Sequence, residues 1–164
     1  MDRFERLFRD EYSKVVGIAY RVLADRQEAE DVAQEVFVDF HRLHRADAPY
    51  AGPWLHRAAA NSALNAVRSR SRRSRREATY GALETPRSVD PAEVVEVTED
   101  RLLVRTALAR LPAKSATVLA LRYGGLSYAE VAQALGVKVG QIGTLLRRAE
   151  AKLRREVEND ATSR

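Results

Sequence analysis

The stretch SYAEVAQALGVKVGQIGTLLRRA, residues 127–149, decides the fold of the C-terminal part of the chain. Ser127 and Glu130 have the spacing of a capping box, which predicts the start of a short helix. Gly136 is suited to the positive φ of a helix C-terminus, and a second helix is expected from about Val139. Two helices joined by a glycine-centred turn predict a helix-turn-helix.

The second helix of this motif carries polar side chains that suit phosphates and base edges in a DNA major groove. They are Gln141, Thr144, Arg147, Arg148 and Lys152. Base reading is expected from Gln141, Thr144 and Arg148, with Arg147 and Lys152 holding the backbone. A helical hairpin within an ordinary core is the alternative. The helix-turn-helix is favoured because the turn chemistry matches at several positions.

Six arginines among the nine residues from Arg68 to Arg76 form a second signal. Upstream, the same predicted helix carries an aromatic ring and polar groups, namely Trp54, His56, Arg57, Asn61 and Asn65. An aromatic ring and amides beside a cationic track are typical of proteins that hold the unstacked bases of a single strand. Two alternatives stand: a solvated charge run for the arginines, and a core position for Trp54.

The acidic segment 28–39 is a third signal, an amphipathic helix that Asp25 begins. Its predicted apolar face is Ala29, Val32, Ala33, Val36, Phe37, Phe40 and Leu43. Paired carboxylates can serve acid–base chemistry or bind a metal, but no glycine loop or convergent nucleophile accompanies them. His41 and His44 could share a metal, yet without cysteine and with three histidines in all, no metal site is expected. A protein-docking face is the better interpretation.

Helical periodicity extends through the rest of the chain, and no segment alternates as a strand would. Further helices are expected over about 4–23, from about Trp54 into the arginine run, from Asp90 to Leu111, and from Pro112 to Gly124. Pro49, Gly52 and Pro53 are expected to break the chain before Trp54. The predicted fold is all-α, with two small helical domains at 1–77 and 98–158 joined by a flexible acidic linker over 78–97.

The amino-acid composition excludes several kinds of protein. The 164 residues contain no cysteine, which excludes disulfides and cysteine nucleophiles. No run approaches 18 apolar residues and no signal-peptide core is present, so a cytoplasmic protein is expected. The net charge of +5 is uneven, with two basic segments, 41–77 and 101–164, separated by acidic ones. This alternation suggests two anionic contacts and an acidic surface for another partner; random drift along solvated faces is the alternative.

Taken in order, the three motifs resemble those of group IV, or extracytoplasmic function (ECF), sigma factors of bacterial RNA polymerase. The segment 28–37 is similar to the family's "DAEDLVQEVF" in region 2.2. The segment 54–61, continuing into the arginines, resembles the "WLxxIAxN…LRR" of regions 2.3 and 2.4. Residues 111–137 and 147–153 resemble region 4. Three motifs in the correct succession make the resemblance specific.

The resemblance implies a promoter-specificity subunit that is not an enzyme and needs no cofactor. Its implied partners are promoter DNA and core RNA polymerase, bound through the clamp and flap of the polymerase. The implied polymerase contacts are Asp31, Gln34, Glu35 and Phe37. The implied contacts with the −10 element are Trp54, Arg57, Asn61, Asn65, Arg68, Arg72 and Arg73. For the −35 element, the implied contacts are the polar residues of the helix-turn-helix named above.

Two rival functions remain at the level of sequence. A stand-alone helix-turn-helix regulator would use residues 1–76 to sense a ligand, and the basic stretch 54–76 argues against it. An enzyme built on the carboxylates of 28–39 would need a metal or pocket that the sequence does not supply. The target promoters, the inducing signal and a possible anti-sigma factor at the membrane stay open.

Overall fold

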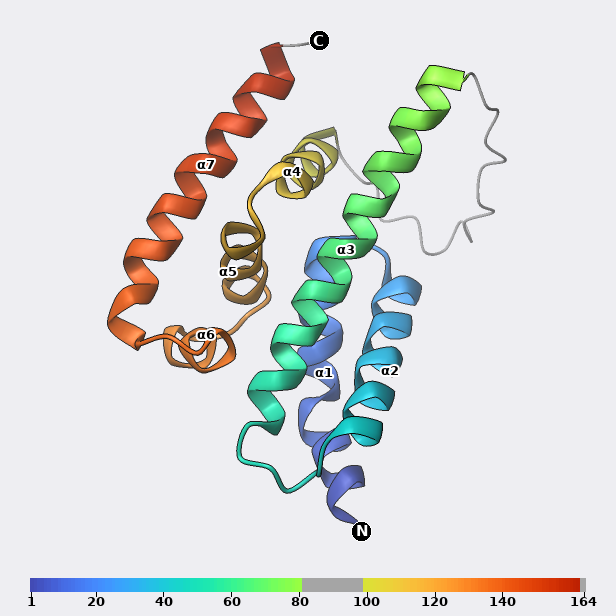
Figure 1. Cartoon of the computed structure of the whole chain (residues 1–164), viewed down its shortest axis with the longest axis vertical. Helices are drawn as coiled ribbons and strands as arrows, with labels where there is room; N and C mark the ends of the chain where they lie inside the picture. Colours follow the sequence, from blue (N-terminus) through green and yellow to red (C-terminus); the bar gives the residue numbers. More distant parts are fainter. Residues whose placement is uncertain (81–98, 163–164) are drawn as a thin grey trace.

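The computed structural model describes residues 1–80 and 99–162, which form helices joined by turns (Figure 1). The elements are α1 Arg3–Leu23, α2 Arg26–Leu43, α3 Ala51–Tyr80, α4 Glu99–Arg110, α5 Ala113–Tyr123, α6 Tyr128–Leu135, the 3-10 turn η2 Val139–Gln141, and α7 Ile142–Thr162. No strand occurs in these two ranges, so the all-α prediction is confirmed there. The helix start expected at Asp90 lies outside the described residues.

Two aspartates cap the first two helices, and the cap at Asp25 is the one that the sequence predicts. The Asp2 carboxylate accepts the Glu5 backbone N–H at 2.7 Å, and the Asp25 carboxylate accepts the Glu28 N–H at 2.9 Å. These bonds satisfy donors that have no intrahelical partner. Ala24, with φ 55°, makes the turn between α1 and α2. The two helices therefore run antiparallel with almost no loop.

α3 begins earlier than the sequence predicts. The expected break at Gly52 and Pro53 is wrong, because both residues lie in the first turn of a helix that starts at Ala51. Proline is tolerated there since the first N–H groups of a helix have no acceptor. A Cβ on Gly52 would lie 3.1 Å from Glu11 Oε1, so glycine allows α1 to approach. The helix continues to Tyr80, which makes it about 45 Å long.

α1, α2 and α3 pack as an N-terminal bundle around aliphatic and aromatic side chains. Its largest fully buried members are Val15, Ile18, Leu23, Val36, Phe37, Phe40, Leu55 and Leu64. Leu43, predicted on the buried face of α2, is 68% exposed. That prediction is wrong because α2 ends at Leu43 and the chain turns away from the core.

The C-terminal domain contains the predicted helix-turn-helix. Ser127 and Glu130 form the complete capping box, and Gly136 ends α6 with φ 71°. Ala132 and Ile142 are buried within this domain. The last helix opens at Val139 as the 3-10 turn η2, and α7 continues to Thr162.

The two domains lie against each other, a placement that the sequence left open. α3 contacts α4, α5 and α6, and α1 contacts α5 (Figure 1). The buried side chains of both domains belong to one continuous apolar cluster. None of the described helices has a stretch long and apolar enough to span a bilayer.

Candidate nucleic-acid and polymerase interfaces

A stripe of polar side chains follows one face of α3. Its members are Arg57, Asn61, Asn65, Arg68, Arg72 and Arg76. Their spacings of three and four residues place them along one face of the helix. All are exposed except Arg68, which is half-buried. The helix thus presents a long cationic and amide-bearing surface, called the α3 stripe below, in which two amides lie between Arg57 and the guanidinium groups from Arg68 onward.

Arg73 and Arg70 of the basic run lie off this stripe. Arg73 follows Arg72 directly and is therefore turned about 100° around the helix. Arg70 forms an ion pair with Glu28 of α2, and Glu28 has only 14% of its side-chain surface exposed. The run therefore includes exposed arginines, such as Arg72 and Arg73, and one, Arg70, that joins two helices.

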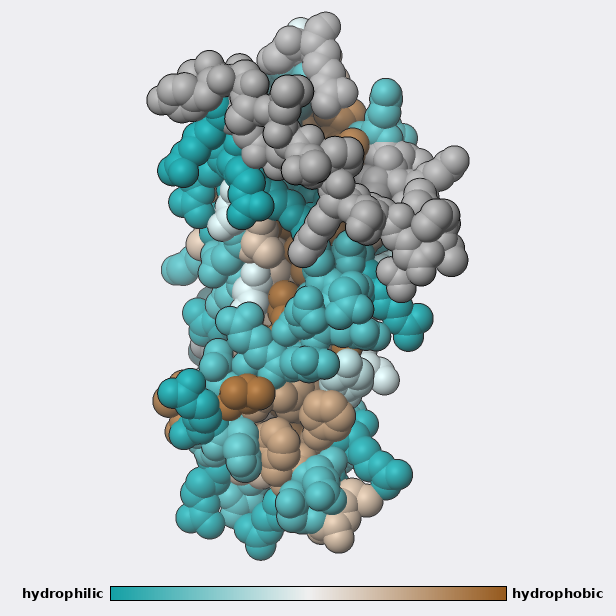
Figure 2. Space-filling view, turned by 90° about the vertical axis from the view of Figure 1, so that its right-hand side faces the viewer, coloured by the Kyte–Doolittle hydropathy of each residue, from teal (hydrophilic) through white to brown (hydrophobic). Residues whose placement is uncertain are grey.

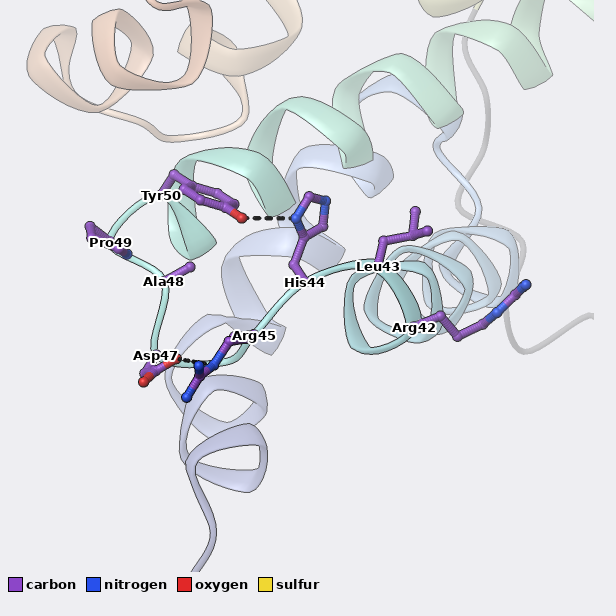
Figure 3. A pocket seen from close by; sticks show the side chains of 8 residues that line it. All are labelled: Arg42, Leu43, His44, Arg45, Asp47, Ala48, Pro49 and Tyr50. Atoms are coloured by element: carbon purple, nitrogen blue, oxygen red, sulfur yellow. Dashed lines mark hydrogen bonds and ion pairs between the residues drawn. The ribbon is translucent and has the colours of Figure 1, made fainter.

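The loop between α2 and α3 forms an open pocket of about 620 Å³ at the N-terminal end of α3 (Figure 3). His44 Nδ1 lies 2.9 Å from the Tyr50 hydroxyl, and Arg45 pairs with Asp47 at 3.5 Å. Tyr50 is half exposed. A ring of this kind beside a basic loop can stack on a nucleotide base.

Trp54 packs beneath this loop. Its ring lies 5.4 Å from that of Phe40 and 5.0 Å from that of His44, so it is partly buried in an aromatic cluster. His56, on the same predicted helix, is 4% exposed and faces α1. Sequence reasoning missed Tyr50 and treated His44 only as a possible metal ligand. Their position in a short loop next to Pro49 was the available signal.

A second polar stripe, called the α7 stripe below, runs from the end of η2 along α7. Gln141, Thr144, Arg148 and Lys152 follow one another at three- and four-residue steps and are all exposed. Ile142, Leu146 and Ala149 are buried on the opposite side, which fixes α7 against α5 and α6. The stripe therefore points away from the domain core, as recognition of duplex DNA requires.

Gln141 and Arg147 have hydrogen-bond partners within the domain. Gln141 Oε1 accepts the Lys138 backbone N–H at 3.3 Å, which caps η2. Arg147 lies to one side of the stripe, and its guanidinium donates to the Thr144 hydroxyl at 3.4 Å. Arg148 and Lys152 are both exposed at the surface of this helix.

The acidic face of α2 is the third surface. Asp31, Gln34 and Glu35 are exposed on one side of the helix, and Asp31 accepts a hydrogen bond from Gln27 at 3.1 Å. Val38 continues the same side and is 55% exposed. Sequence reasoning did not single out Val38, which lies off the predicted apolar face of this helix.

Phe37 does not share this surface. It is 2% exposed and lies among Phe4, Phe8 and Tyr12 of α1. In this structure its side chain therefore lies beneath the acidic face of α2 and is not exposed on it. Figure 2 shows an apolar patch on the lower half of the side view, and the exposed apolar side chains of α1 and α2 include Phe8 and Val38.

The carboxylates of segment 28–39 do not converge. Glu28 pairs with Arg70, and Glu30 pairs with Arg26 at 3.4 Å. Across the described ranges 1–80 and 99–162, no three His, Cys, Asp or Glu side chains are grouped as metal ligands would be. His41 packs on Phe4 while His44 faces Tyr50, so the two histidines point to different partners.

Two helical domains, one with an exposed cationic and amide stripe and one with a helix-turn-helix, define a DNA-binding protein of the transcription machinery. Residues 7–73 match the model of Sigma-70 region 2, and residues 101–153 match that of Sigma-70, region 4. The chain is 33% identical over 159 residues to the ECF RNA polymerase sigma factor SigE of Mycolicibacterium smegmatis, covering 94% of this chain and 61% of that protein. The chain belongs to the ECF group of sigma-70 family RNA polymerase sigma factors.

Other relatives agree with this assignment. The RNA polymerase sigma-H factor of Pseudomonas aeruginosa is 31% identical, with 83% of this chain and 76% of that protein covered. SigK of Mycobacterium sp. (strain KMS) is 30% identical, with 90% and 79% covered. A region 2 match across 7–73 leaves no separate N-terminal sensing domain there, so the stand-alone regulator is not favoured.

Solved structures support the fold. Sigma factor RpoE in complex with the anti-sigma factor NepR from Bartonella quintana aligns with a TM-score of 0.53 and 18% identity, covering 96% of this chain and 98% of that one. CnrH in complex with the cytosolic domain of CnrY aligns with a TM-score of 0.54 and 23% identity, covering 96% and 88%.

Proposed function

We propose that this sigma factor directs initiation by placing the α3 stripe and the α2–α3 loop on the −10 element. Its α7 stripe reads the −35 element as duplex, and the acidic face of α2 docks on core polymerase. The protein supplies binding energy and no covalent chemistry of its own. Flipping a base costs a few kcal/mol, which stacking and phosphate contacts offset.

The observation that carries this proposal is that the α3 stripe continues directly from the α2–α3 loop. Amides at Asn61 and Asn65 lie between the aromatic pocket and the guanidinium groups from Arg68 onward. A single strand laid along this face would meet a stacking surface first and phosphate-binding groups next. This order suits a strand whose base is captured at one end while its backbone is held along the helix.

The α7 stripe supports the second part of the proposal. An exposed α-helix of this length fits the major groove, with base contacts made near its N-terminal end. We assign base reading to Thr144 and Arg148, with Gln141 both capping η2 and bordering the bases. Arg147 and Lys152 hold phosphates.

The acidic face of α2 supports docking on core polymerase. Asp31, Gln34 and Glu35 give it charge and hydrogen-bonding groups, and Val38 adds an exposed apolar side chain. Interfaces of this composition combine a small apolar centre with a polar rim. An anti-sigma factor is a further candidate partner by family membership, and co-purification from the native cell would test it.

Run-off transcription tests the proposed function. Core polymerase, the full chain and genomic promoter fragments should give transcripts with defined start sites. Variants Asn61→Ala and Arg148→Ala should each reduce these transcripts, while Arg9→Ala, exposed on α1, should not. Unchanged transcription by Asn61→Ala and Arg148→Ala would contradict the assignment of both stripes.

A further inference from the structure

A cavity of about 520 Å³ lies between α1, α4 and the turn that follows α5. None of the described residues that line it belongs to the α3 stripe, the α7 stripe or the acidic face of α2. Its volume is within the range of about 300–1,000 Å³ that is typical of small-molecule sites. The cavity is therefore large enough to hold a ligand other than promoter DNA or polymerase.

The charged side chains of this cavity are mainly cationic. Arg21 of α1 and Arg101 of α4 line it and are exposed, and Arg105 of α4 lines it and is half-buried. Among the described lining residues, Asp100 is the one carboxylate. Guanidinium groups bind phosphate oxygens through pairs of N–H donors, so three of them around one cavity favour an anionic ligand.

Arg105 is the most buried of these cations. Its guanidinium donates to the Leu23 carbonyl at 2.7 Å, at the C-terminal end of α1. In the part of the chain that the structure describes, no carboxylate forms an ion pair with it. Burial lowers the pKa of Arg105, the carboxylate of Asp25 partly offsets this effect, and Arg101 adds to it. A half-buried cation in this situation is stabilised by an anion that binds next to it.

Two tyrosines add aromatic surface to the cavity. Tyr20 of α1 is half-buried, and Tyr123 at the end of α5 is 52% exposed. The Tyr123 hydroxyl donates to Glu150 Oε1 on α7 at 2.8 Å, which holds the ring in one direction. An exposed ring that is already held in place can stack on a planar base with little loss of side-chain entropy.

We infer that this cavity binds a free nucleotide that carries a phosphate chain. The three guanidinium groups bind the phosphate oxygens, and the ring of Tyr123 stacks on the base. Asp100 repels phosphate, so it lies at the other end of the ligand, where its carboxylate accepts hydrogen bonds from ribose hydroxyls. This site goes beyond promoter recognition and does not depend on the proposed role of either stripe.

A substitution that fills the cavity without a change of charge tests this inference in the full chain. Val104 lines the cavity and is 40% exposed, so Val104→Trp occupies the space of the ligand and removes no core side chain. Leu102 is 44% exposed on the same helix and does not line the cavity. Leu102→Trp is therefore the matched control, and circular dichroism compares the helicity of the two variants.

Arginine substitutions separate this cavity from the general positive charge of the protein. The α3 stripe attracts any polyphosphate, so Arg72→Gln on that stripe measures adventitious binding there. Arg21→Gln removes one cation of the cavity. Arg6→Gln, exposed on the same helix and outside the cavity, is its matched control. Isothermal titration calorimetry with ATP, GTP, tripolyphosphate and adenosine measures the affinity of each protein.

We expect ATP and GTP to bind the wild type at one site, and tripolyphosphate to bind at least about tenfold more weakly because it lacks a base to stack. Adenosine, which lacks the phosphates, should not bind measurably. Val104→Trp should abolish nucleotide binding, and Arg21→Gln should weaken it about tenfold, as the loss of one charge-assisted contact does. Leu102→Trp, Arg6→Gln and Arg72→Gln should bind ATP as the wild type does.

Several outcomes would overturn the inference. One is a wild-type protein that binds neither nucleotide, and another is full nucleotide binding by Val104→Trp. Equal losses in Arg21→Gln and Arg72→Gln would show adventitious binding of polyphosphate to surface arginines only. Equal affinities for ATP and tripolyphosphate would show that no base is held in the cavity.

Discussion

The imidazole Nε2 of His56 lies 2.6 Å from Oε2 of Glu11, which fastens the start of α3 to the middle of α1. His56 is 4% exposed, and its Nδ1 is buried without a hydrogen-bond partner in the described structure. The tautomer that carries the proton on Nε2 supplies the donor for Glu11 and leaves Nδ1 as an acceptor. The α2–α3 loop thus ends on a helix that is held in place by a buried polar contact.

Loss of this contact should destabilise the N-terminal bundle. Glu11→Ala leaves a buried donor unsatisfied, at a cost of about 1–3 kcal/mol in the free energy of unfolding. Urea denaturation monitored by circular dichroism measures it. Glu30→Ala, which removes an exposed pair with Arg26, is the control and should cost less than about 0.5 kcal/mol. Equal losses in the two variants would contradict a special role for Glu11.

The acidic face of α2 should be required for polymerase binding. Asp31→Ala combined with Glu35→Ala should abolish co-purification with core polymerase while helicity stays unchanged, because both side chains are exposed. Val38→Ala should weaken binding without abolishing it, since it removes a small apolar contact. Retention of full binding by the double variant would show that α2 is not the docking face.

Two adjacent arginines should differ in their effect on −10 DNA. Arg72 lies on the α3 stripe, whereas Arg73 is turned about 100° from it. Arg72→Ala should weaken binding of single-stranded DNA and reduce the slope of log K against log salt by about 0.7, the value for one phosphate on a single strand. Arg73→Ala should change that slope less. Titration of the full chain between low and high salt measures both, and a reversed order would place the strand on another face.

The α7 stripe predicts different roles for Arg147 and Arg148. Arg148→Ala should relax preference at one base position by about 1–3 kcal/mol of discrimination. Arg147→Ala should weaken binding to all sequences about equally. Selection from a library of −35 duplexes with holoenzyme distinguishes the two effects. If Arg147→Ala altered the preferred sequence and Arg148→Ala did not, the assignment of roles would be wrong.

Glu130 should make stability depend on acid pH. Its carboxylate accepts hydrogen bonds from Lys14 and from the Ser127 N–H, which lower its pKa from 4.5 to about 2. A depressed pKa stabilises the folded protein above pH 4.5, and this contribution disappears as the pH falls towards 2. Glu130→Gln should therefore flatten the dependence of unfolding free energy on pH in this window, whereas Glu158→Gln, exposed on α7, should not. Parallel curves for wild type and Glu130→Gln would contradict the assignment.

Local sequence signals predicted the helices well and their ends less well. The capping box at Ser127 and the glycine at 136 are local devices, so one sequence suffices to find them. Pro53 misled the prediction because a proline ends a helix or begins one, and only packing against α1 decides between the two. Leu43 was assigned to the core by periodicity, which does not show where a helix ends.

In the candidate sites, too, local features could be predicted from the sequence, whereas contacts between helices could not. Periodicity places Asn61, Asn65 and Arg72 on one face of α3 without any structure. The buried position of Phe37, the pairing of Arg70 with Glu28 and the aromatic loop at Tyr50 depend on contacts between helices. The contact between the two domains joins residues that are far apart in the sequence. Asn61 and Thr117, for example, are 56 positions apart, and no local pattern predicts their hydrogen bond.

α3 is one unbroken helix from Ala51 to Tyr80, and it acts mechanically as a lever. Rotation of its loop end by about 10° would move the far end by about 8 Å, given a length of about 45 Å. α4 and α5 rest against this helix, so a rotation of α3 that began at the proposed base pocket beside Tyr50 would also move the C-terminal domain.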